Sequence, residues 1–532
     1  MSAPEQLVQS YLDLRWHFDP AAATAAGITS QNERLGDYDV ESMRVHVAAF
    51  RSLALAIEAL DVESTETEID RTAVLNEIRT TIFRFEQEQP HVRNPTFWLS
   101  HLYNALYSLM DRQEAPDPVL AAAALARLRM VPAFIASAAA TLRDPAPILA
   151  ETAIQMVEGG GTLIGRIAAF AQERGMPGDE VGEAAGEAEA ALARFGWALK
   201  TDLPASGDPQ SFAIGEDAFN HRLHFEYALQ GTAPELWRYG MRLVEEVEAG
   251  LVETAREIDP NTSWRDLAAR LRSEHPASGD PIVTYQSGME QARDFVRRHD
   301  LVSIPEAPLV VVPTPEFLRP LIPIAAYSPP GPYHQDRSGR FYVTPRSDGG
   351  EARASRSIHE LPSLVLHEGY PGHHLQMVTA QSLPSMVRRV LWTPLTVEGW
   401  ALYCEGMMDE LGFYQDPAAR LFQQVHLLWR AVRILLDVGL HTRGMSPSAA
   451  LVYLIDKVPL DQAEAAAEIR RYCGAPTYQL CYAVGRREIL ALRDDYQRRA
   501  GSSFTLRKFH DDLLGYGGLP VSLARWGMGL EQ

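Results

Sequence analysis

The chain has 532 residues, of which 46% are hydrophobic, so it is long enough for several domains or one large helical body with a sizeable core. Its 69 acidic and 49 basic residues give a formal charge of −20, which argues against binding to nucleic acid or to an anionic membrane. No apolar run approaches the roughly 20 residues that a membrane helix needs, and the start of the sequence lacks the features of a signal peptide. The cysteine count is odd and sparse, which is typical of a reducing compartment. These features predict a cytoplasmic protein and leave its oligomeric state open.

Residues 1–300 have the periodicity and composition of helices. Apolar residues recur at helical spacing in residues 7–14 and 50–57, and alanine-rich stretches at 121–128 and 183–199 favour helix. Turn residues at 115–118, 159–161 and 203–207 predict breaks between helices. We therefore expect an N-terminal helical region over residues 1–300.

The composition changes near residue 300, where β-branched residues become frequent. Residues 309–312, 322–327 and 340–344 are candidate strands, and Pro323 restricts the second of them to the edge of a sheet. An edge strand beside a metal could pair with an extended peptide, although a purely structural hairpin fits the pattern equally well. After residue 360 the pattern is again helical. We expect residues 301–532 to be the catalytic region, continuous with the N-terminal region in one structural unit.

Residues 367–374 read His-Glu-Gly-Tyr-Pro-Gly-His-His and follow an apolar stretch in which Pro362 suits the first turn of a helix. A His followed directly by Glu, with another His one to two turns later, is how a zinc hydrolase helix presents two imidazole ligands and a general base. A lone His-Glu pair is more often part of the surface. Three imidazoles, a Glu and a Pro-Gly break within eight residues favour a metal site.

The spacing of this motif leaves its second imidazole ligand open. In a straight helix, His374 would return to within roughly 20° of His367, whereas His373 would lie about 120° away. Pro371 and Gly372 interrupt such a helix, however, and a local bulge there could absorb two extra residues and realign His373. Periodicity alone favours His374.

Three carboxylates are candidates for the rest of the site. Glu368 is adjacent to His367, a placement that suits a base taking a proton from metal-bound water. Glu398 opens a second helix-like run, is followed by Gly399, and is the candidate third ligand. Glu405 lies seven positions later on the same helix face, where it could orient a ligand imidazole or simply face solvent.

Several segments resemble the bacterial family catalogued as domain of unknown function 885: residues 367–376, 398–403, 482–486, 509–514 and 518–520. The resemblance covers most of the chain and is most specific in its last third. That family is grouped with zinc peptidases of the gluzincin type and is distantly similar to helical carboxypeptidases and angiotensin-converting enzyme. The resemblance implies a mainly α, gluzincin-like fold with a small β-sheet beside the active-site helix.

The resemblance also implies a set of site residues. The Gly-His pair of these relatives aligns with Gly372 and His373, which makes His367, His373 and Glu398 the expected ligands of one Zn²⁺ with an open fourth position. Tyr482 matches the family's Tyr-x-x-Gly pattern and is expected to stabilise the oxyanion. His510 is a weaker candidate for that role.

The function that follows is zinc-dependent hydrolysis of a peptide or peptide-like amide, with Glu368 as the base. One alternative keeps the metal but hydrolyses a small non-peptide amide or ester in secondary metabolism. Another is a metal-binding protein without catalysis, which would not need Glu368.

Overall fold

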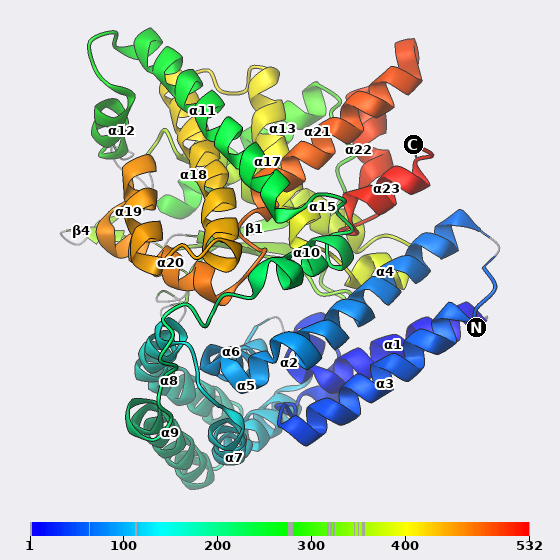
Figure 1. Cartoon of the computed structure of the whole chain (residues 1–532), viewed down its shortest axis with the longest axis vertical. Helices are drawn as coiled ribbons and strands as arrows, with labels where there is room; N and C mark the ends of the chain where they lie inside the picture. Colours follow the sequence, from blue (N-terminus) through cyan, green and yellow to red (C-terminus); the bar gives the residue numbers. More distant parts are fainter. Residues whose placement is uncertain are drawn as a thin grey trace. The chain divides into compact units, whose positions relative to one another are not determined.

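The computed structural model describes residues 3–62, 64–111, 114–274, 280–315, 319, 322, 325–344, 346–348, 351–353 and 357–530. Helices account for 71% of it, and a small three-stranded sheet accompanies them, so the mainly α fold expected from the sequence is confirmed. The chain divides into two compact units (Figure 1). Residues 1–214 and 331–335 form the first unit, and residues 215–330 and 336–532 form the second.

The described part of the first unit is helical: α1 (Ala3–Phe18), α2 (Pro20–Ala26), η1 (Thr29–Gln31), α3 (Val40–Glu58), α4 (Thr65–Phe83), η2 (Arg84–Glu88), α5 (Pro90–Arg93), α6 (Pro95–Ser108), α7 (Asp117–Thr141), α8 (Pro147–Glu173) and α9 (Gly178–Thr201). Trp98, Leu128, Ile164 and Phe195 contribute to its core from α6, α7, α8 and α9. By length and composition α7 is apolar enough to cross a membrane, but 56% of its apolar window is buried inside the fold. This burial is what a core helix requires.

The glycine run at residues 159–161 does not break the chain, and the predicted turn there is wrong. Helix α8 continues through it. A Cβ on Gly160 would collide with the hydroxyl of Tyr103 and lie 3.0 Å from Leu192. Each interior glycine costs about 1 kcal/mol of helix stability relative to alanine, and the close packing of α8 against α6 and α9 offsets that cost.

The second unit contains the remaining elements: α10 (Gly215–Phe225), α11 (Ala233–Ile258), α12 (Trp264–Arg272), α13 (Pro281–Arg298), β1 (Leu309–Pro313), β2 (Ala325–Ser328), β3 (Gly339–Val343), β4 (Arg346–Asp348), β5 (Glu351–Arg353), α14 (Leu361–Glu368), α15 (His373–Ala380), α16 (Met386–Val390), α17 (Pro394–Glu410), α18 (Pro417–Thr442), α19 (Pro447–Lys457), α20 (Gln462–Gly474), α21 (Cys481–Ala500), η4 (Gly501–Ser503), α22 (Leu506–Leu514) and α23 (Val521–Gly527). Helices α10–α13 thus belong to the same unit as most of residues 301–532. The expected organisation, an N-terminal helical region over residues 1–300 and a catalytic region over residues 301–532 in one continuous unit, stays a prediction.

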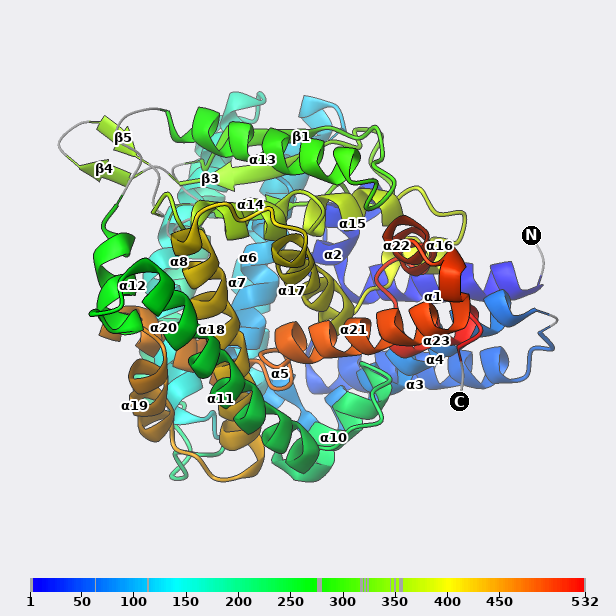
Figure 2. The same ribbon diagram turned by 90° about the horizontal axis from the view of Figure 1, so that it is seen from above.

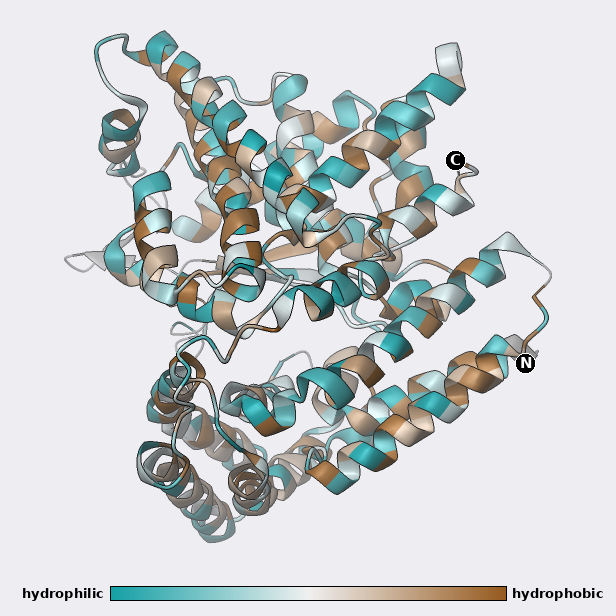
Figure 3. Cartoon of the chain, viewed as in Figure 1, coloured by the Kyte–Doolittle hydropathy of each residue, from teal (hydrophilic) through white to brown (hydrophobic). Residues whose placement is uncertain are grey.

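Two helix pairs form the centre of the second unit. Helix α17 lies beside α21, and α11 lies beside α18 (Figure 2). Helix α18 buries residues on nearly every side over its last three turns, and it carries hydrophobic residues along most of its length (Figure 3). A helix that is buried on nearly every side belongs in a core, so α18 provides a rigid wall for any site built on it.

The three predicted strands form one sheet in the order β1-β3-β2, with β1 parallel and β2 antiparallel to β3. Val311 and Phe341 of this sheet pack against Tyr285 of α13 and Val365 of α14, which sets the sheet beside the predicted active-site helix. Strand β2 is at the edge of the described sheet, as expected, while Pro323 lies outside the described residues. The short β4–β5 pair has no counterpart among the predicted strands.

Candidate metal centre

The predicted His-Glu helix is two short helices, α14 and α15, separated by residues 369–372. Pro362 lies in the first turn of α14, as predicted. Pro371 has no amide hydrogen for a continuous helix, and Gly372 adopts φ −70° and ψ −134°, outside the helical region. A Cβ on Gly372 would collide with the carbonyl oxygens of Leu366 and His367. The chain therefore does not bulge within one helix; it leaves the helix completely and begins a new one at His373.

The break brings His373 beside His367, and Glu398 of α17 completes the group. The Nε2 atoms of His367 and His373 lie 3.5 and 3.4 Å from the same oxygen, Oε2 of Glu398. One candidate ligand atom from each residue lies within 4.8 Å of the other two. In a tetrahedral zinc site with bonds of about 2.0–2.1 Å, neighbouring ligand atoms are roughly 3.4 Å apart. These separations fit a metal ion held by two imidazoles and one carboxylate.

The electrostatics of the group also favour a cation. Oε2 of Glu398 is buried and has no hydrogen-bond partner among the described residues. Burial alone would raise the pKa of Glu398, but His367 and His373 outweigh it and hold the pKa well below its usual range. Burial would likewise lower the pKa of His367, yet Glu398 and Glu405 raise it to about 10. A metal ion would satisfy both the orphaned oxygen and the excess of negative charge.

Glu405 fixes the orientation of His367. The Nδ1–H of His367 donates to Oε1 of Glu405 over 2.8 Å, and only 1% of the Glu405 side chain is exposed. With Nδ1 engaged in this way, Nε2 is the ring nitrogen that points toward Glu398. Glu405 therefore acts on the imidazole, as its helix position allowed, and does not face solvent.

His374 faces away from this group. Its Nδ1 accepts a hydrogen bond from the Tyr327 hydroxyl at 3.1 Å, and its Nε2–H donates to the Ala307 carbonyl at 3.2 Å. The residue is fully buried, with both ring nitrogens occupied by these protein groups. The structure thus brings His373, and not His374, to Glu398.

The crossing of α17 and α21 depends on two glycines. A Cβ on Gly399 would lie 2.5 Å from the Cα of Gly485, and a Cβ on Gly485 would collide with the Leu395 carbonyl. Only glycine at both positions lets the two backbones approach so closely. This approach places the first turn of α21, which carries Tyr482, next to the segment that carries Glu398.

Two contacts that sequence reasoning missed hold Glu398 in place. The Tyr478 hydroxyl donates to Oε1 of Glu398 at 2.9 Å, which leaves Oε2 to face the imidazoles. The indole N–H of Trp400 donates to the Pro371 carbonyl at 2.8 Å and ties α17 to the break between α14 and α15. The signal for Tyr478 was its position four residues before Tyr482, with which its ring packs edge to face.

A cavity of about 400 Å³ opens onto the site. Glu368, the last residue of α14, lines it together with the three candidate ligands, and so does Tyr482. The Tyr482 ring is stacked at 6.4 Å on that of His367. Ala325 and Ala326 of β2 form part of the wall, so the edge of the sheet borders the same space. The cavity is also lined by His426, Arg430 and Arg433 of α18, and no sequence motif marked these residues as part of a site.

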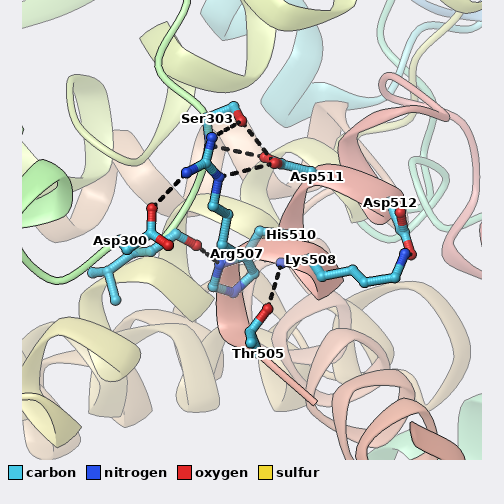
Figure 4. A network of polar contacts seen from close by, with 9 residues as sticks. Asp300, Ser303, Thr505, Arg507, Lys508, His510, Asp511 and Asp512 are labelled. Carbon is cyan, nitrogen blue, oxygen red and sulfur yellow. Dashed lines mark hydrogen bonds and ion pairs between the residues drawn. The ribbon is translucent and has the colours of Figure 1, made fainter. Parts of the chain in front are cut away.

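His510 lies in the core. Its Nδ1–H donates to the Leu301 carbonyl at 2.6 Å, its Nε2 accepts from the Tyr403 hydroxyl at 2.8 Å, and the residue is fully buried. It is carried by α22, where Arg507 forms an ion pair with Asp300 (Figure 4). With both nitrogens engaged, His510 offers no donor to a substrate.

Two solved structures are similar to the whole chain. One, from Shewanella oneidensis, is described as "a putative lipoprotein of unknown function"; it is 23% identical, with a TM-score of 0.79, over 99% of this chain and 100% of that chain. The other, a "putative lipoprotein" from Colwellia psychrerythraea, is 18% identical, with a TM-score of 0.82, over 99% of each chain. An M32 carboxypeptidase from Deinococcus radiodurans R1 is 11% identical with a TM-score of 0.43, over 99% of this chain and 95% of that chain, a likeness too weak to carry an argument. No curated protein matches the chain.

The expected cytoplasmic location is contradicted by these two structures, because a lipoprotein is held at a membrane surface by its lipid. The cysteines could not reveal this. Cys404, Cys473 and Cys481 are free and buried, and burial raises their pKa values, that of Cys473 to about 12. A buried, protonated thiol is inert to oxidation, so free cysteines of this kind do not distinguish one compartment from another.

The family model described as "Bacterial protein of unknown function (DUF885)" matches residues 20–528. That span includes the broken His-Glu motif, the α17 carboxylates and the α21 tyrosine. The chain belongs to the DUF885 family.

Proposed function

We propose that this protein is a zinc-dependent hydrolase of a peptide or peptide-like amide bond. The observation that carries the proposal is the convergence of His367, His373 and Glu398 at tetrahedral ligand spacing, with the carboxylate of Glu368 in the same cavity. Two imidazoles and one carboxylate are a usual donor set for catalytic zinc, which keeps a fourth position open. Zinc held there would supply a Lewis acid for the attacking water and for the substrate carbonyl.

The roles of the protein side chains follow from their positions. Glu368 accepts a proton from the attacking water and passes it to the leaving amine. Burial raises the pKa of the Tyr482 phenol, with Glu398 adding to the effect, so the hydroxyl stays protonated at neutral pH. It can then donate a hydrogen bond to the carbonyl oxygen as negative charge develops. Glu405 and Tyr478 hydrogen-bond to His367 and Glu398 and act by positioning them.

Strand β2 supports a peptide as the substrate. Its one described neighbour is β3, and Ala325 and Ala326 border the cavity. The outer edge of an edge strand offers backbone N–H and C=O groups to an extended chain. A substrate backbone aligned there would run along the same cavity wall as Glu368 and His373.

The experiment is hydrolysis of a peptide panel by the full chain after removal of metal and after addition of one equivalent of zinc. We expect activity only in the zinc-loaded protein, and none in zinc-loaded Glu368→Gln. Hydrolysis of small amides or esters without any peptide cleavage would redirect the proposal to a non-peptide substrate. Zinc binding with no hydrolysis of any substrate would make the protein a metal-binding protein.

A further inference from the structure

Arg430 is a cation in the cavity wall that forms no ion pair with any described residue. Its Nη1 donates only to the His426 carbonyl of its own helix, at 3.3 Å, and its Nε is buried without a hydrogen-bond partner. Burial lowers the pKa of Arg430 and outweighs the opposing attraction of Glu405 and Glu398, neither of which pairs with it directly. A guanidinium carries five N–H donors, and a buried donor without an acceptor costs free energy, so Arg430 has donors to offer to a ligand in the cavity.

The neighbouring arginine, one turn along α18, shows the usual arrangement. Arg433 lines the same cavity, but it bonds Glu468 at 3.0 Å and the Tyr472 hydroxyl at 2.9 Å. Its charge is therefore compensated within the protein. Arg433 is thus paired with a carboxylate of the protein, whereas Arg430 is not and can still bind the carboxylate of a ligand.

Arg430 also lies close to the candidate metal centre. Its guanidinium carbon lies 5.7 Å from the centre of the Tyr482 ring and 5.8 Å from that of Trp429. The Tyr482 ring is the same one that stacks on His367. A single aromatic side chain thus contacts both the imidazole and the guanidinium, so one short substrate can reach both.

We propose that Arg430 binds a carboxylate of the substrate, and that this carboxylate is the free C-terminus of a short peptide. The inference rests on the hydrolase function proposed above and narrows its substrate class. A planar guanidinium matches a carboxylate with two parallel hydrogen bonds. The protein would then cleave close to the C-terminal end of its substrate.

Charge and volume favour this ligand over other anions. The cavity wall also contains Glu360, Glu368, Glu398 and Glu405, so a dianionic phosphate would meet more repulsion than one arginine can offset. A volume of about 400 Å³ lies at the small end of the range for ligand sites and suits a few residues of peptide. An acidic side chain offers the same carboxylate chemistry, and the test below separates the two sources.

The test compares three peptides: acetyl-trialanine, its C-terminal amide, and an acetylated alanyl-alanyl-glutamate blocked as the C-terminal amide. We expect the free acid to be cleaved with a kcat/KM roughly 10- to 100-fold above that of the amide, the usual effect of a hydrogen bond to a charged group. Arg430→Gln should reduce this ratio to about 1, and Arg430→Lys should restore part of it. Arg420→Gln, which removes a charge from an exposed pair elsewhere on α18, is the matched control and should leave the ratio unchanged. A ratio near 1 in the wild type, or an unchanged ratio in Arg430→Gln, would overturn the inference.

The source of the carboxylate is read from the third peptide. If the blocked glutamate peptide equals the free acid in the wild type and loses its advantage in Arg430→Gln, Arg430 binds an acidic side chain, and the C-terminal assignment is overturned.

Binding without turnover separates this inference from the proposed function. The same peptides are titrated by calorimetry into Glu368→Gln and into Glu368→Gln with Arg430→Gln. We expect the free acid to bind the first variant roughly 10- to 100-fold more tightly than the amide, and the two to bind the second variant alike. This result without any hydrolysis by the wild type would support Arg430 and overturn the hydrolase. Hydrolysis by the wild type with no preference for the free carboxylate in either assay would support the hydrolase and overturn the role of Arg430.

Discussion

His367 and Glu405 are 38 positions apart in sequence and share a hydrogen bond of 2.8 Å between Nδ1 and Oε1. The bond holds the imidazole with its second nitrogen toward Glu398, and Glu405 has almost no exposed surface from which to form another contact. The geometry of the candidate metal centre therefore depends on a residue that would not touch the metal.

We expect Glu405→Gln to lower zinc affinity by about 10- to 100-fold, because the loss of such an orienting carboxylate weakens the ligand it holds. Competition with a chromophoric chelator measures the affinity. Glu410→Gln is a suitable control on the same helix, since Glu410 is half exposed and pairs only with Arg493 at the surface. Equal affinities in the two variants would remove Glu405 from this role.

His373→Ala should lose the metal, whereas His374→Ala should keep it. The reason is that the structure turns His373 toward Glu398 and gives both nitrogens of His374 to Tyr327 and Ala307. Metal content of the purified variants checks the prediction. His374→Ala should instead lower the melting temperature, because it removes a fully buried ring and its hydrogen bonds to the Tyr327 hydroxyl and the Ala307 carbonyl. Metal loss in His374→Ala with retention in His373→Ala would reverse the assignment.

Glu368→Gln should bind zinc as the wild type does and lose nearly all activity. Glutamine preserves the shape of the side chain but cannot accept the proton of the attacking water. Single-turnover hydrolysis and metal content are measured on the same preparation. Near-normal turnover would show that another group serves as the base.

Tyr482→Phe and Tyr478→Phe should impair different properties of the protein, the first its turnover and the second its zinc affinity. Removal of the Tyr482 hydroxyl should lower kcat on the order of 100-fold with little change in KM, because its bond strengthens only in the transition state. Removal of the Tyr478 hydroxyl frees Oε1 of Glu398 and should mainly weaken zinc binding. Steady-state kinetics at saturating zinc separate the two. A change confined to the melting temperature of Tyr482→Phe would make that residue part of the core.

His510 should reduce stability in mild acid. Burial lowers its pKa from 6.5 to about 4, so the folded protein favours the neutral ring. The stability that the neutral ring contributes is fully present above about pH 6.5 and is lost as the pH falls toward 4. The loss of stability at pH 5, relative to neutral pH, is about 2 kcal/mol. Urea unfolding at pH 7 and pH 5 should show a smaller acid loss in His510→Gln than in the wild type. Since His91 also has a pKa lowered to about 4 by burial, the difference between the two proteins is the quantity to compare.

Local sequence signals predicted the parts of the fold that local interactions determine. The strands near residues 309–312 and 340–344 follow from β-branched composition, and the start of α14, with Pro362 in its first turn, follows from the fixed φ of proline. The glycine run at 159–161 led to the wrong prediction of a turn. The contacts that require a glycine there, with Tyr103 and Leu192, come from residues far away in the sequence.

The same distinction holds for the candidate site. His367, Glu368 and Glu398 have recognisable neighbours in the sequence, and periodicity alone preferred His374 over His373. Tyr478 and Arg430 have no motif, because each becomes part of the site only when α17, α18 and α21 pack together. Whether Arg430 has a partner depends on the positions of carboxylates throughout the second unit, which composition does not reveal.

The break between α14 and α15 has a consequence for how such motifs diverge. Without Tyr370 and Pro371 the segment would read His-Glu-Gly-Gly-His, with its two imidazoles four residues apart as on an ordinary zinc helix. That shorter segment would lose the Pro371 carbonyl, to which Trp400 ties the helix that carries Glu398 and Glu405. We therefore expect the two extra residues and the indole at position 400 to be coupled. In related chains, the number of residues between the two histidine ligands and the identity of the residue two positions after Glu398 should vary together.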